Sequence, residues 1–148
     1  YITTPYLIIT DEMERELRLA VKRGVDVRIV TPGIPDKKLV YRITRSYYEP
    51  LCSAGVRIYE YTPGFCHAKQ WVCDDEVSVV GTINMDYRSL YLHFENGIYI
   101  YKSKILKDIK EDFLKTEEVC HEVTLEEVIT GKFMGWFEAI LRVIAPLL

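Results

Sequence analysis

Several features that mark particular classes of protein are missing from this sequence of 148 residues. Its four cysteines form no C-x-x-C pair, which argues against a zinc site and favours a reduced, cytosolic environment over a disulfide framework. There is no secretory signal peptide and no run of about 18 apolar residues that could span a bilayer. The net charge of −3 argues against a general nucleic-acid binder.

The sequence does not start as a complete chain would, and it closes with an apolar segment. It begins at Tyr1, without Met and inside an apolar stretch, so we expect a piece of a longer protein. The last segment, 132–148, predicts a helix that is apolar except for a narrow polar stripe. Trp136, Phe137 and Ile140 on this helix would either dock at a lipid interface or pack against protein, and we favour packing.

The first half of the chain predicts layered α/β structure. Two amphipathic helices, one capped by Asp11 and one that starts near Asp36, each lead through a glycine into an apolar strand. The expected strands are 25–30 and 56–61, and Pro50 should kink or restart the second helix. Further strands are expected at 67–73, 76–81 and 93–101, with a helix after Ser103. The length and this pattern predict one α/β domain over 1–148, with a mixed sheet flanked by helices.

The segment from Gly64 to Leu90 carries the residues that indicate chemistry. If His67 and Lys69 lie on one strand, they project from the same face, about 6.6 Å apart. A neutral imidazole can act as nucleophile or move a proton. A nearby ammonium can bind a phosphate oxygen, so the pair suits phosphoryl transfer without a metal.

Further polar residues follow at the strand ends. Thr82 and Asn84 begin an irregular loop, which is a good position for donors to phosphate oxygens. Glu95, on an expected neighbouring strand, can fix the tautomer of His67. Each residue alone also fits an ordinary hairpin, with His67 at an edge and Asp74 in a turn. The combination at matched spacing favours an active site.

The spacing His67-x-Lys69-x4-Asp74-x6-Gly81-Thr82-x-Asn84 resembles the HKD motif of the phospholipase D superfamily. Glu95 follows the histidine by 95 − 67 = 28 residues, where that superfamily places its histidine-orienting carboxylate. Gly-Thr stands here in place of the commoner Gly-Ser. The segments GVDVRIVTPGIP, AGVRIYEY and NMDYRS, and the ending APLL, resemble the second catalytic half of bacterial cardiolipin synthases.

This resemblance implies a phosphatidyltransferase that condenses two phosphatidylglycerols into cardiolipin and glycerol through a phosphatidyl-histidine intermediate. It implies that His67 is catalytic, that Lys69 and Asn84 bind phosphate with help from Thr82, and that Glu95 orients His67. In two-motif members the C-terminal histidine is usually the acid and base, and we favour that role for His67. Asp74 belongs to the motif, but its expected place at a strand end favours a structural role. The resemblance implies no metal and no organic cofactor.

The sequence departs from the family pattern because it contains a single H-x-K motif. We therefore expect a partner, either the N-terminal HKD half of the same enzyme or a second copy in a homodimer, and little activity from the isolated chain. The resemblance places the whole enzyme at the bacterial cell membrane, while this segment itself would be soluble. A phospholipase D-type hydrolase or nuclease-like phosphodiesterase is the first alternative. A non-catalytic domain that binds lipid headgroups or supports a partner is the second.

Overall fold

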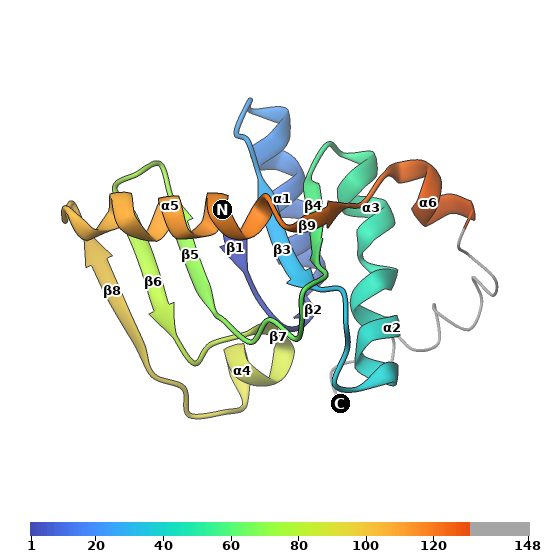
Figure 1. The fold of residues 1–148 in the computed structure, drawn as a ribbon, viewed down its shortest axis with the longest axis horizontal. Coiled ribbons are helices and arrows are strands. Elements are labelled where there is room, and N and C mark those ends of the chain that lie inside the picture. Colours follow the sequence, from blue (N-terminus) through green and yellow to red (C-terminus); the bar gives the residue numbers. More distant parts are fainter. Residues whose placement is uncertain (131–148) are drawn as a thin grey trace.

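The computed structural model describes residues 1–130, which form a seven-stranded mixed sheet with helices on both faces (Figure 1). The strands are β1 (Ile2–Thr3), β2 (Leu7–Ile8), β3 (Arg28–Pro32), β4 (Arg57–Tyr61), β5 (Gln70–Cys73), β6 (Val77–Gly81), β7 (Met85–Asp86), β8 (Gly97–Tyr101) and β9 (Cys120–Glu122). The helices are α1 (Asp11–Lys22), α2 (Lys38–Ser46), α3 (Tyr48–Ser53), α4 (Tyr87–Tyr91), α5 (Ile105–Glu117) and α6 (Leu125–Thr130). The predicted α/β class with a mixed sheet flanked by helices is confirmed.

The large sheet has the strand order β8-β6-β5-β1-β3-β4-β9. Its centre is parallel, because β3 pairs in parallel with both β1 and β4. On one side β5, β6 and β8 continue the sheet in antiparallel pairs, and on the other side β9 closes it against β4. The sheet therefore consists of a parallel centre, an antiparallel extension of three strands and one short closing strand.

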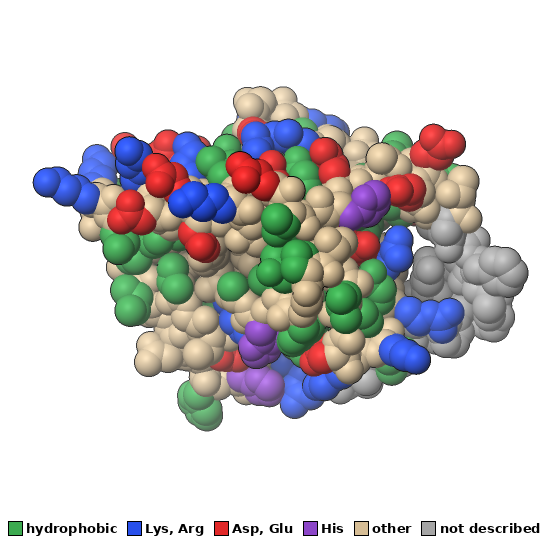
Figure 2. All heavy atoms as spheres, viewed as in Figure 1, with side chains coloured by type: hydrophobic (Ala, Val, Ile, Leu, Met, Phe, Trp, Pro, Cys, Tyr) green, Lys and Arg blue, Asp and Glu red, His purple; other side chains and the backbone are tan. Residues whose placement is uncertain are grey.

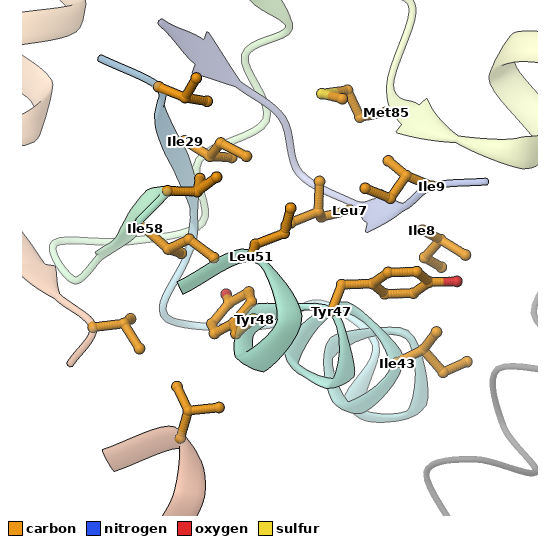
Figure 3. Close-up of a cluster of buried hydrophobic side chains, with 14 residues drawn as sticks. Leu7, Ile8, Ile9, Ile29, Ile43, Tyr47, Tyr48, Leu51, Ile58 and Met85 are labelled. Atoms are coloured by element: carbon orange, nitrogen blue, oxygen red, sulfur yellow. The ribbon is translucent and has the colours of Figure 1, made fainter. Parts of the chain in front are cut away.

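The parallel strands are buried on both faces, as parallel strands usually are. Ile29 and Ile58 point into a large core that α1, α2 and α3 cover, and Figure 3 shows both near side chains of α2 and α3. Val30 and Tyr59 alternate to the other face, where they pack against Phe113 of α5. This alternation follows from the two-residue period of a strand.

The helix boundaries follow local sequence signals. Thr10 caps α1, since its side chain accepts a hydrogen bond from the backbone N–H of Met13 at 3.3 Å, so the prediction of Asp11 as the cap was wrong by one residue. The prediction that a glycine ends each helix is confirmed. Gly24 follows α1 and Gly55 follows α3, with φ values of 91° and 96°, and each glycine lies a few residues before the next strand. These angles lie in the left-handed region that glycine adopts at little cost.

The long helix expected between Asp36 and Gly55 is divided in two. It is interrupted at Tyr47, which lies between α2 and α3, and Pro50 occupies the third position of α3. Proline is tolerated in a first turn because the backbone N–H that it lacks has no partner there. The predicted restart is thus confirmed, and it lies a few residues before the proline.

A second, two-stranded sheet joins the two halves of the chain near the ends of the large sheet. In this small sheet β2 and β7 pair in parallel, with Leu7 opposite Met85. The buried hydroxyl of Thr4 accepts a hydrogen bond from the backbone N–H of Met85 at 3.0 Å. This pairing holds the segment after β6, which includes Asn84, against the N-terminal strands.

No helix within residues 1–130 is both long and apolar enough to cross a membrane. The C-terminal helix predicted over 132–148 lies outside the described residues.

Candidate active site

The histidine and lysine of the predicted motif lie in an irregular segment immediately before β5. The prediction of a strand from residue 67 was wrong, since β5 begins only at Gln70, and the expectation that alternate residues share one strand face does not apply here. Instead, the ammonium of the Lys69 side chain donates a hydrogen bond to the backbone carbonyl of His67 at 2.7 Å. The exposed imidazole of His67 lies 5.5 Å from the ring of Phe65, centroid to centroid.

The end of β6 closely approaches β8, and a glycine makes this possible. Gly81 is paired with Gly97 across the two strands. A Cβ atom on Gly81 would lie 2.2 Å from the carbonyl oxygen of Asn96 and 2.6 Å from the Cα of Gly97. The next residue, Thr82, donates its backbone N–H to the Asn96 carbonyl at 2.9 Å, and its hydroxyl accepts the Asn96 N–H at 3.0 Å. The glycine therefore fixes the position of Thr82.

Glu95 lies between α4 and β8, and it is bound on both sides by hydroxyl groups. The predicted strand 93–101 begins only at Gly97, so Glu95 itself is in a loop. One carboxylate oxygen accepts the hydroxyl of Thr82, and the other accepts that of Ser89 at 2.9 Å. These hydrogen bonds lower the pKa of Glu95, because they stabilise its ionised form.

The carboxylate of Glu95 therefore makes no hydrogen bond to His67, the residue that it was expected to orient. Within residues 1–130 its hydrogen bonds go to Thr82 and Ser89, and the imidazole nitrogen within ion-pair distance belongs to His93, at 3.7 Å. The predicted hydrogen bond to His67 is not present in this structure. Glu95 instead organises the loop that carries the other polar residues.

Ser89 is a functional candidate that the sequence analysis missed. It is buried, and its backbone N–H donates to the carboxylate of Asp86 at 2.7 Å, which caps α4. Its hydroxyl accepts the amide N–H of Asn84 at 3.1 Å and donates to Glu95. The Asp-x-x-Ser spacing is a helix-capping signal that could have indicated this arrangement. Ser89 thus connects Asn84 to Glu95 and fixes the direction of the Asn84 side chain.

A cavity of about 480 Å³ lies where these segments meet, and we call it the phosphate cleft. Its lining includes His67, Lys69, Gln70, Gly81, Thr82 and Asn84. Partial burial is the main influence on the Lys69 ammonium and lowers its pKa, although Glu95 opposes this effect. Figure 2 shows two histidine side chains together at the lower edge of the molecule, beside Lys and Arg side chains. The cleft therefore combines an imidazole with an ammonium and an amide, beside a hydroxyl that donates to Glu95, and this set suits a phosphate ester.

Asp74 lies away from the phosphate cleft. It occupies the turn between β5 and β6, whereas His67 precedes the opposite end of that hairpin. Asp74 and Asp75 are the central residues of a turn that the Glu76 N–H closes onto the Cys73 carbonyl at 3.1 Å, and both have positive φ values, 52° and 58°, as a type I′ turn requires. Asp75 also binds the Lys110 ammonium at 2.7 Å. Asp74 therefore lies in the turn at the end of the hairpin away from His67, and the structural role expected for it stays a prediction.

The described residues, 1–130, contain no group of three or more His, Cys, Asp and Glu side chains that could hold a metal ion. The donor set of the phosphate cleft, with one imidazole, one ammonium, a hydroxyl and an amide, is also unlike a metal site.

Comparisons with known proteins show the family to which this chain is similar. Residues 1–116 match the family model described as cardiolipin synthase, PLD-like domain. The whole chain is 50% identical to an uncharacterized protein of Streptococcus mutans and 45% identical to a cardiolipin synthase of Clostridium perfringens. It covers 32% and 31% of these two relatives, so it spans about a third of their length.

Solved structures show the same fold at low sequence identity. Phosphatidylserine synthase of Haemophilus influenzae superposes with a TM-score of 0.73 at 16% identity, over 99% of this chain and 41% of that one. Nuc of Salmonella typhimurium, a phospholipase D family member, gives 0.72 at 18% identity, over 83% of this chain and 80% of its own.

Proposed function

The chain belongs to the family of cardiolipin synthase PLD-like domains, and from this premise we propose that it is the C-terminal catalytic half of a phosphatidyltransferase. The reaction would condense two phosphatidylglycerols into cardiolipin and release glycerol. The observation that carries the proposal is the phosphate cleft, where His67, Lys69, Thr82 and Asn84 line one cavity. These residues match the HKD spacing and offer the groups that phosphoryl transfer needs.

The proposed reaction has two displacements. In the first, an imidazole nitrogen attacks the phosphorus of phosphatidylglycerol, a P–N bond forms, and the P–O bond to the headgroup glycerol breaks. The leaving oxygen takes a proton from a second imidazole, which is the role we assign to His67. In the second, a hydroxyl of another phosphatidylglycerol gives its proton to His67 and attacks the phosphorus, and the P–N bond breaks.

The remaining residues of the cleft would stabilise charge on the phosphoryl oxygens. The ammonium of Lys69 and the amide of Asn84 line the same cavity, and the pair Ser89–Glu95 holds the amide in place. Thr82 adds a hydroxyl beside them. Such prepositioned donors stabilise a transition state because they need not reorganise as charge develops. The proposal invokes no metal and no organic cofactor, since side chains supply each group that it needs.

The proposal requires a second imidazole, and this sequence has one H-x-K motif. We propose that the partner is an N-terminal HKD half of the same protein, which agrees with relatives about three times as long, while a second copy of the chain is the alternative. The reaction would take place at the surface of a bacterial membrane, where both lipid substrates reside. The isolated chain should therefore be nearly inactive.

The decisive experiment supplies phosphatidylglycerol, in mixed micelles, to a full-length protein that carries this chain together with a first HKD half. Cardiolipin and glycerol in equal amounts are the expected products. Phosphatidic acid as the only lipid product would instead identify a hydrolase of the same superfamily. Binding of phosphatidylglycerol without any turnover would support the non-catalytic alternative and contradict the proposal.

A further inference from the structure

A second cavity, of about 290 Å³, adjoins the phosphate cleft. The two share Asn84 as a lining residue. The second cavity lies between α2, β2, β7 and α4, and its lining includes Tyr6, Lys37, Asp86, Arg88 and His93. The roles assigned above to the phosphate cleft account for Asn84 but not for these five residues.

The charges around this second cavity are mixed. Lys37 and Arg88 contribute two cations, and His93 adds an imidazole. The opposing charges are the buried carboxylate of Asp86, which accepts the Ser89 backbone N–H at 2.7 Å, and Asp36, which accepts the Tyr6 hydroxyl at 2.6 Å. The cations would attract a simple anion in this cavity, and the carboxylates would repel it. A ligand with a phosphate and several hydroxyl groups would match both sets, because carboxylates accept hydrogen bonds from hydroxyls and cations bind phosphate.

The cavity also offers apolar surface beside its polar groups. Ile8 and Val40 line it together with the ring of Tyr6. Burial and the neighbouring Asp36 carboxylate raise the pKa of Tyr6 to about 12, so its hydroxyl stays protonated and continues to donate to Asp36. Apolar walls with a few convergent polar groups are typical of sites for small organic molecules. The size suits a lipid headgroup.

We propose that this cavity is the acceptor pocket, which binds the glycerol-phosphate headgroup of the second phosphatidylglycerol. The inference rests on the proposed function, since it gives a place to the second substrate of that reaction. The two phosphates of cardiolipin are separated by one glycerol, so a donor site and an acceptor site must be neighbours. The shared residue Asn84 makes the two cavities neighbours.

In the transfer step, the acceptor's primary hydroxyl reaches from the acceptor pocket into the phosphate cleft. Its oxygen forms a bond to the phosphorus, the P–N bond of the phosphatidyl-histidine breaks, and its proton passes to His67. Lys37 holds the acceptor's own phosphate, and Asp86 orients the glycerol hydroxyls. Lys37 is thus assigned to acceptor binding and has no part in forming the intermediate.

Two reactions of the full-length protein separate the two sites. Exchange of labelled free glycerol into phosphatidylglycerol needs the donor site and a small alcohol, whereas cardiolipin formation also needs the acceptor lipid. In the variant Lys37→Gln, cardiolipin formed per exchange event should fall by about tenfold at low phosphatidylglycerol, because a charge-assisted hydrogen bond to phosphate is lost. Raising the phosphatidylglycerol concentration should restore part of this loss.

The matched control is Lys38→Gln, which removes an exposed lysine one position along α2 that does not line the pocket. Its ratio of cardiolipin to exchange should equal that of the unchanged protein. An unchanged ratio in Lys37→Gln, or an equal fall in both variants, would overturn the acceptor pocket while leaving the proposed function in place. Phosphatidic acid as the only product of the unchanged protein would overturn both.

Discussion

The parallel centre and the antiparallel edge of the large sheet differ in burial and in chemistry. In β3, at the parallel centre, four of five residues are buried, whereas in β8, at the antiparallel edge, four of five are exposed. The hydrophobic core lies on the parallel side, while the phosphate cleft lies where β5 and β6 meet the loops around α4. One part of the sheet therefore supplies stability, and the other presents polar groups to a ligand.

The sharpest test of this division is His67→Ala. We expect the turnover of the full-length protein to fall by about 10³-fold or more, because a group that transfers protons in both steps is removed. The free energy of unfolding should hardly change, since His67 is exposed and outside the core. Turnover measured with labelled phosphatidylglycerol, beside a thermal melt, checks both statements, and an unchanged turnover would refute the site.

Ile58→Ala should have the opposite effect. Ile58 of β4 is 0% exposed, so its truncation should destabilise the chain by about 2–5 kcal/mol. Ile98→Ala on β8 is the matched control, because Ile98 is 66% exposed and its truncation should cost less than about 0.5 kcal/mol. Urea unfolding of the three proteins measures the difference. Similar losses at the two positions would show that the sheet is not divided in this way.

Gly81→Ala should lower both stability and turnover, since Gly81 lies where the antiparallel strands meet the phosphate cleft. The added Cβ would collide with the backbone of β8 and displace Thr82, at a cost of about 1–3 kcal/mol in stability. Activity should fall with it. The control is Gly64→Ala, because a Cβ at Gly64 meets no atom within 4 Å. Melting temperature and turnover of both variants provide the measurement.

Ser89→Ala should change the titration of Glu95. The hydroxyl groups of Thr82 and Ser89 lower its pKa, so loss of one donor should raise it towards the ordinary value. Because a lowered pKa stabilises the fold at pH values above the ordinary one, this contribution is lost as pH falls through the folded-state pKa. Carbon-13 NMR of the labelled carboxyl group, assigned with Glu95→Gln, reports the midpoint. An unshifted midpoint would show that the Ser89 hydrogen bond is not formed.

The smallest effect is expected from Asp74→Asn. Its side chain lies in the β5–β6 turn, and Asn tolerates a positive φ as well as Asp does. Turnover should change by less than about threefold and stability by less than about 0.5 kcal/mol. A loss of turnover close to that of His67→Ala would show that Asp74 takes part in catalysis.

Much of the fold could be predicted from local sequence patterns. The glycine stops at Gly24 and Gly55 were predicted correctly, because their positive φ angles depend on neighbouring residues alone, but β3 begins at Arg28, three residues later than expected. The starts of β5 and β8 were predicted too early, since an apolar alternation also continues through the irregular segments that carry His67 and Glu95. Strand β9 was not predicted, because its pairing with β4 depends on a contact distant in sequence.

The sequence by itself determined the fold class and the family, and it singled out His67, Lys69, Thr82 and Asn84, which line the phosphate cleft. These depend on periodicity and on spacing along the chain. Only the tertiary structure decided which of these residues meet. The pairing of Gly81 with Gly97 and the capping of α4 by Asp86 bring Thr82, Ser89 and Glu95 together, and the hairpin carries Asp74 away from the cleft. Hydrogen bonds between distant segments depend on strand register and loop direction, which spacing alone does not fix.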